Sequence, residues 1–205
     1  MTFSITARCD RTGMFGVAIT TSSIAVGSRC PWVRAGVGAV ATQNVTLPSI
    51  GGDVLDLLEG GTAPQTALDQ VLGPDAHPSY RQVAVVSAKD QALFSGSESL
   101  GIHTHAQGHG CIAAGNLLAT DRVPSAMISS FEGNAEAHLA ERLLRALEVG
   151  LGAGGEAGPV KSAALLVADT HPWPLVDLRV DWADEPVAQL RALWTDYLPQ
   201  MDDYV

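Results

Sequence analysis

The chain has 205 residues, is 46% hydrophobic and carries a formal net charge of −10. A chain of this length and apolar content can bury a large core, so we expect one domain over residues 1–205. The 12 basic residues are scattered and the 22 acidic ones outnumber them, which argues against nucleic acid or an anionic membrane as partner. With no leader segment or membrane-spanning apolar run evident, we expect a cytoplasmic protein whose three cysteines are reduced.

The first predicted element is a strand at the very start of the chain. Residues 2–8 alternate polar and apolar side chains, which is the period of a half-buried strand. If Met1 is removed, Thr2 carries a hydroxyl nucleophile and a free α-amine with an ordinary pKa of about 8, a nucleophile and its base on one residue. The alternative is that Thr2 is simply the first residue of an ordered strand. A retained Met1 would also block the amine.

A second strand over residues 15–21 follows a turn and completes a predicted hairpin. The hairpin places Thr2 beside the far end of the second strand, where Ser22 and Ser23 follow. We interpret these two hydroxyls as groups that orient the Thr2 amine, or else as caps for backbone groups at a strand end.

Residues 24–34 are expected to be irregular, and a strand rich in small residues follows over 35–42. Polar side chains stand at its end, namely Thr42, Gln43 and Asn44. They are candidates for substrate contacts or an oxyanion donor, although Asn and Gln at a strand exit also form turns.

Two helices are predicted next, one over 52–58 and one opened by a capping box from Thr62 to Gln65. A second hairpin follows over residues 80–96. Arg81 at its start is a candidate anchor for a substrate carboxylate, with a surface ion pair as the alternative.

Three of the six histidines, His103, His105 and His109, lie in the glycine-containing segment 101–111. Their spacing is compatible with zinc ligands, but the glycines favour a loop without fixed geometry, and no second ligand cluster is present in the sequence. We therefore expect no metal and no cofactor. Metal hydrolysis by these histidines stays as an alternative hypothesis.

An apolar strand over 111–118 contains Gly115 and Asn116, and the asparagine is either an oxyanion donor or part of a bulge or turn. Helices from Pro124 and over 135–149, strands over 161–168 and 175–182, and an amphipathic helix over about 186–198 complete the pattern. The last helix is expected to cover a sheet or, through Trp194 and Tyr197, to join two subunits.

This order of hairpins and segregated helices predicts an α+β fold of two packed antiparallel sheets with helices outside. Several sequence blocks in this order resemble the bacterial family called domain of unknown function 1028. These blocks are residues 2–8, 35–43, 80–83, 114–119 and 139–144. The resemblance covers nearly the whole chain and implies the four-layer αββα fold of the N-terminal-nucleophile (Ntn) hydrolases, in which the first residue of the mature chain attacks an amide. It supplies a mechanism class and no substrate.

The leading hypothesis from the sequence is an Ntn-type amide hydrolase acting on a small amide or amino-acid derivative. Thr2 would be the nucleophile once Met1 is removed, and Asn116 with a backbone N–H near Gln43 or Asn44 would hold the oxyanion. Ser22, Ser23 and Ser162 would orient the amine. The alternative is a non-catalytic binding or assembly module that keeps Met1, and in either case we expect a homodimer.

Overall fold

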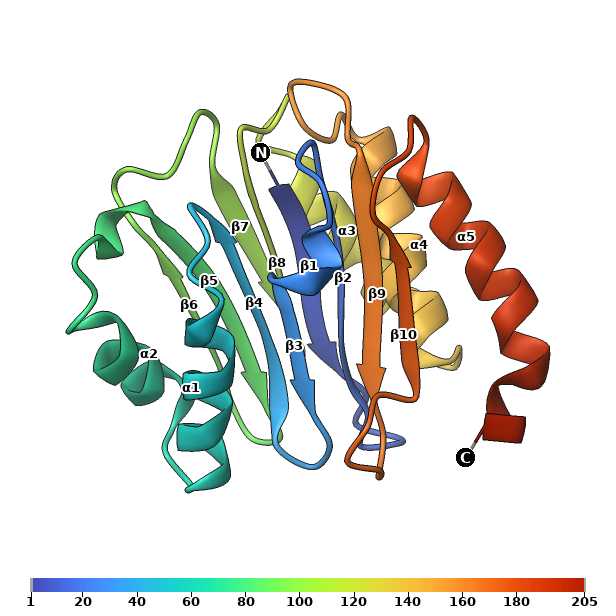
Figure 1. The fold of residues 1–205 in the computed structure, drawn as a ribbon, viewed down its shortest axis with the longest axis horizontal. Helices are drawn as coiled ribbons and strands as arrows, with labels where there is room; N and C mark the ends of the chain where they lie inside the picture. The colour runs from blue at the N-terminus through green and yellow to red at the C-terminus, as the bar shows by residue number, and fades with distance from the viewer. Residues whose placement is uncertain (1, 205) are drawn as a thin grey trace.

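The computed structural model describes residues 2–204, and its strands form two antiparallel sheets (Figure 1). The larger sheet has the strand order β10-β9-β2-β1-β8-β7. Its strands are β1 (Thr2–Arg8), β2 (Phe15–Thr21), β7 (Thr104–Gly108), β8 (Cys111–Asn116), β9 (Ser162–Ala168) and β10 (Val176–Val180). The smaller sheet has the order β3-β4-β5-β6, with β3 (Pro31–Arg34), β4 (Gly38–Asn44), β5 (Arg81–Ser87) and β6 (Gln91–Ser95).

Helices cover the outer face of each sheet, which confirms the predicted α+β architecture of two antiparallel sheets flanked by helices (Figure 1). The smaller sheet is covered by α1 (Ser49–Glu59) and α2 (Pro64–Leu72), and the larger by α3 (Val123–Glu132), α4 (Leu139–Gly152) and α5 (Pro186–Tyr197). Short 3₁₀ turns lie at Val26–Ser28, Pro78–Tyr80 and Leu198–Tyr204. Among residues 2–204, no helix has the length and apolar character needed to cross a membrane.

Side-chain alternation along the strands divides the core into layers. Apolar residues of β1 such as Phe3 and Ile5 pack with α3 and α4, whereas Val40 of β4 packs with α1 and α2. Between the sheets, larger side chains such as Phe15, Ile19 and Ile112 pack with small ones, which include Ala39, Ala41, Ala84 and Ala164. Because side chains two residues apart share a face of a strand, these layers also fix where each polar side chain points.

The first strand is central in the larger sheet, with β2 on one side and β8 on the other. Thr2 is paired with Thr21 of β2 and with Asn116 of β8, so the start of β1 is held on both sides. The predicted hairpin and the predicted neighbourhood of Thr2 are thereby confirmed. Met1 lies outside the described residues.

Two segments that the sequence pattern left irregular contain strands. Residues 24–34 include β3, which pairs with β4, and residues 101–111 include β7, which pairs with β8. Both are short strands at sheet edges, where partners distant in sequence override a weak local pattern. The predicted capping box is also wrong, since α2 begins at Pro64 after Ala63 and has no side-chain cap.

The C-terminal helix packs within its own chain. Trp194 is buried and its indole N–H donates to Glu141, while the Tyr197 hydroxyl donates to the carbonyl of Leu175. The C-terminal helix therefore covers the larger sheet, which is one of the two roles that the sequence pattern offered for it.

Candidate functional site

A line of hydroxyl groups starts at Thr2, whose side chain lies between the two sheets and is 5% exposed. Thr2 Oγ1 donates to Thr21 Oγ1 at 3.2 Å, and Thr21 Oγ1 lies 3.3 Å from Ser23 Oγ. The guanidinium of Arg29 donates to Ser23 Oγ at 2.9 Å. A buried hydroxyl at the start of the chain is thus connected through two further hydroxyls to a cationic side chain.

Ser162, at the start of β9, fixes the segment that follows β2. Its hydroxyl donates to the carbonyl of Ser23 at 2.6 Å and accepts from the N–H of Val26 at 3.1 Å. The structure therefore brings Ser22, Ser23 and Ser162 to the same end of the larger sheet as Thr2, and the sequence predicted this neighbourhood for the two serines after β2. The hydroxyl of Ser162 is committed to backbone partners, so it positions this segment.

A buried chain of amide side chains crosses between the sheets next to Thr2. Ser4 Oγ donates to Gln43 Oε1 at 2.7 Å, and Gln43 Nε2 donates to Gln82 Oε1 at 2.7 Å. Asn116 Nδ2 donates to the same Gln82 Oε1 at 3.2 Å. Because Asn116 is the register partner of Thr2, this chain holds an amide N–H donor directly beside the candidate nucleophile.

Thr42 and Arg81 lie away from Thr2. Both alternate with residues that face between the sheets, so their side chains point toward the α1 and α2 layer. Arg81 forms a buried ion pair with Asp75, with 2.6 Å between Nε and Oδ2, and also donates to the carbonyl of Val45. The structure places neither residue in the site, and the ion pair of Arg81 is buried rather than on the surface.

Asn44 ends β4 with a positive φ of 72°, and its side chain hydrogen-bonds to neighbouring backbone groups. Its Nδ2 donates to the carbonyl of Tyr80, and its Oδ1 accepts from the N–H of Leu100. These bonds tie two loops together at the end of the smaller sheet. Of the three polar residues predicted at this strand exit, Gln43 alone faces between the sheets toward Asn116.

Sequence reasoning missed Glu156, which is 6% exposed and lies in the connection between α4 and β9. Neither carboxylate oxygen has a hydrogen-bond partner within residues 2–204. Burial raises the pKa of the Glu156 carboxyl to about 7, and the neighbouring Ser22 opposes part of this rise. The sequence offered one signal, an acid directly after the glycine-rich run 152–155.

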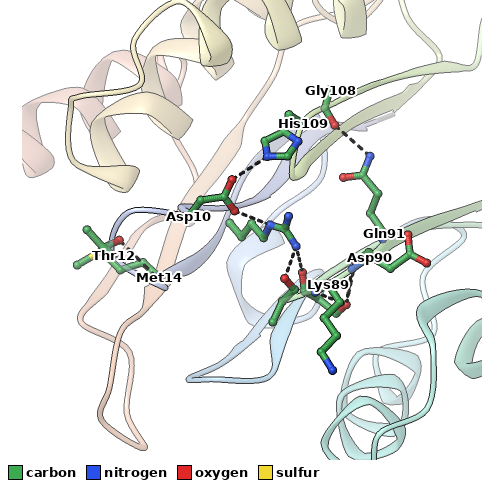
Figure 2. Close-up of polar contacts among 11 residues, drawn as sticks. Asp10, Thr12, Met14, Lys89, Asp90, Gln91, Gly108 and His109 are labelled. Atoms are coloured by element: carbon green, nitrogen blue, oxygen red, sulfur yellow. Dashed lines mark hydrogen bonds and ion pairs between the residues drawn. The ribbon is translucent and has the colours of Figure 1, made fainter.

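His103 directly precedes the edge strand β7, His105 lies within it and His109 follows it, so β8 separates all three from β1. His109 lies at the opposite end of the larger sheet, where its Nε2 is 2.7 Å from Asp10 Oδ2 (Figure 2). The same aspartate pairs with Arg8 at 2.8 Å. Within the described part of the chain, no group of three or more His, Cys, Asp or Glu side chains is arranged to hold a metal ion.

A surface hollow of about 550 Å³ lies at the end of the smaller sheet opposite to the Thr2 site. Its walls include Val37, Leu58 and residues 87–90, at the end of β4 and β5 opposite to Asn44 and Arg81. Its lining combines apolar residues with charged ones, namely Glu59, Lys89 and Asp90. The chemistry of the Thr2 end therefore belongs to the space between the sheets and to the loops above it.

Residues 2–190 match the model of a family described as a family of unknown function, DUF1028. A crystal structure of protein SPO2555 from Silicibacter pomeroyi, assigned to the same family model, is 33% identical with a TM-score of 0.88, covering 96% of this chain and 85% of that one. No protein of curated function is significantly similar to this chain.

Two Anbu structures are similar over nearly all of both chains. Anbu from Hyphomicrobium sp. strain MC1 is 12% identical with a TM-score of 0.49, covering 99% of this chain and 97% of that one. Anbu (ancestral beta-subunit) from Yersinia bercovieri is 10% identical with a TM-score of 0.41 at the same coverage. Likeness at these scores has no bearing on function.

Proposed function

This chain belongs to the DUF1028 family, and we propose that it is an amide hydrolase whose nucleophile is the hydroxyl of Thr2. The observation that supports this proposal is the position of Thr2. It begins the central strand of the larger sheet, its hydroxyl is buried beside other hydroxyls, and a register partner brings an amide donor alongside.

The reaction begins with attack of Thr2 Oγ on the carbonyl carbon of an amide, while the hydroxyl proton passes to the Thr2 α-amine. The new C–O bond gives a tetrahedral intermediate. Its collapse breaks the C–N bond, and the ammonium returns the proton to the leaving amine. Water then hydrolyses the acyl ester by the same route, so that one amide and one water yield one acid and one amine.

The oxyanion of that intermediate needs preorganised N–H donors. Asn116 Nδ2 has two N–H groups and uses one toward Gln82 Oε1, which fixes the direction of the other. We place the second donor in the backbone at the end of β4, near Gln43 and Asn44. Gln43 contributes indirectly, because its own amide bonds hold Gln82 in place.

The substrate class is a small amide or amino-acid derivative. The side chains beside Thr2 include the hydroxyl of Thr21 and the amide of Asn116. Such groups suit a polar substrate that forms several hydrogen bonds, and none of the proposed steps requires a metal or an organic cofactor. The homodimer stays a prediction that sedimentation of the purified protein would test.

Intact mass of the protein from its native host is the first test. A mass lacking one methionine would support a free Thr2 amine, whereas complete retention of Met1 would favour the non-catalytic binding or assembly module. A screen of small amides with the Met-free chain then tests turnover. Thr2→Ala should abolish it and Thr2→Ser should retain part of it.

The control for the Thr2 variants is Thr6→Ala. Thr6 lies on the same face of β1, is fully buried, and its hydroxyl has no hydrogen-bond partner within residues 2–204. Its loss should leave turnover close to that of the parent. A Thr2→Ala protein with full turnover on a confirmed substrate would refute the proposal.

A further inference from the structure

Glu156 occupies the place in the larger sheet directly beyond the start of β1. Its backbone is bridged to Leu118, and Ala157 N–H donates to the carbonyl of Leu117 at 2.9 Å. On the other side of this stretch, the N–H of Leu118 donates to the carbonyl of Ile102. Residues 155–157 therefore lie on the same side of the β8 extension as β1 lies of β8, just beyond Thr2. Figure 1 shows this orange connection at the same end of the sheet as the start of β1.

The other neighbour of β1 approaches the same residue. Thr21 of β2 is paired with Thr2, and Ser22, which follows it, is the residue whose proximity lowers the pKa of the Glu156 carboxyl against the effect of burial. The extensions of β2 and β8 thus flank Glu156, as β2 and β8 themselves flank Thr2. In a Met-free chain the Thr2 nitrogen would point into this space, because it is the first atom of β1.

A carboxylate that is more than nine-tenths buried without a hydrogen-bond partner costs stability unless a cation accompanies it. We propose that Glu156 is a positioning residue for Thr2: its carboxylate pairs with the Thr2 ammonium group and sets how much of that amine is free to act as a base. The inference rests on the proposed function, in which the amine is the base.

The other charged side chains on the elements around Glu156 are engaged or exposed. Arg29 donates to Ser23 and to backbone carbonyls, and Lys161 pairs with Asp184. Asp121 and Arg122, which follow β8, are exposed to solvent. Of the groups described around it, none supplies the positive charge that the Glu156 carboxylate lacks, which leaves the amine of a processed chain as the fitting partner.

The test measures the pH dependence of acetylation of the Thr2 amine by N-hydroxysuccinimide acetate, read by mass spectrometry. Thr2 is exposed by cleavage of an N-terminal fusion and verified by intact mass. In Glu156→Gln the loss of a nearby negative charge should lower the apparent pKa of the amine by about one unit, so labelling below that pKa becomes several-fold faster. Glu156→Asp should fall between parent and Glu156→Gln.

Glu136→Gln is the matched control, because Glu136 is an exposed acid in the connection between α3 and α4. An amine titration in Glu156→Gln that matches parent and control would overturn the inference. If Glu156→Gln does not fold, the titration of the Thr2 amine in the parent decides, since a pairing with Glu156 requires a pKa above the ordinary value of about 8. Acetylation needs no turnover, so absence of amide hydrolysis would refute the proposed function alone.

Discussion

Replacement of Gln82 by leucine tests whether the buried amide chain holds the site together. Gln82 Oε1 accepts from Gln43 at 2.7 Å and from Asn116 at 3.2 Å, while its Nε2 donates to the carbonyl of Gly115 and to the hydroxyl of Ser95, both at 3.2 Å. Leucine has a similar size but no polar atom. Gln82→Leu therefore leaves two buried amide donors without an acceptor.

The cost follows from those two donors. Each buried donor left unsatisfied costs about 1–3 kcal/mol, which gives about 2–6 kcal/mol for the pair. Burial of the leucine side chain returns about 1.5–3 kcal/mol. We expect a net loss of about 2 kcal/mol in the free energy of unfolding, together with reduced turnover, because Asn116 loses the acceptor that orients it.

Urea denaturation of parent and variant at neutral pH measures this loss, provided that both unfold with the same slope. Gln91→Leu is the matched control. Gln91 Nε2 also donates to several acceptors, among them Gln107 and the carbonyl of Gly108, but these contacts are near the surface, where water replaces them. Equal stability of Gln82→Leu and Gln91→Leu would refute the reasoning.

Three further outcomes are expected. In a chain that keeps Met1 and so has no Thr2 ammonium to pair with Glu156, Glu156→Gln should stabilise the fold by about 2–3 kcal/mol above pH 7 and by little near pH 4. The folded-state pKa of about 7 lies above the unfolded value, so the parent loses stability as pH rises from the unfolded to the folded pKa, and denaturation at both pH values checks this. Asp75→Asn should lose stability at pH 7 but converge with the parent as pH falls through the lowered folded pKa of Asp75, which the hydrogen bond from its arginine partner holds down. In thermal melts Gly51→Ala should be destabilised, since its Cβ would lie 2.1 Å from Trp32, whereas Gly52→Ala, in open space one residue later, should be neutral or more stable by up to about 1 kcal/mol.

Strong local periodicity made the central parts of the fold predictable. The alternation over residues 2–8 and 15–21 determined the first hairpin, and the leucine-rich stretches gave α1 and α4 to within a few residues. The strands β3 and β7 were missed because they have only four or five residues and acquire strand geometry from pairing with β4 and β8. Such pairings depend on the assembled sheets, which a local pattern does not describe.

Residues of the candidate site could be predicted where the strands that carry them are neighbours in the sequence and pair with each other. Thr2 and the serines after β2 were found because one hairpin brings them together. Asn116 was found from its residue type alone, whereas Gln82, its acceptor, lies in the other sheet and gave no signal. Thr42 was predicted to lie in the site because the strand was expected to end at residue 42. β4 instead continues to Asn44, so Thr42 lies within the strand and its side chain points to the opposite face from Gln43.

The strand pairing that holds Thr2 is distinct from the amine that removal of Met1 would create. Thr2 is paired with Thr21 and Asn116, so the contacts that hold it come from β2 and β8. Removal of Met1 should therefore create the amine without loosening the strand. Hydrogen exchange at Phe3, the first amide beyond Thr2, checks this: equal protection in Met-retaining and Met-free chains is expected. A large loss of protection after Met1 removal would show that the terminus frays, and a frayed Thr2 cannot keep its hydroxyl aligned with Asn116.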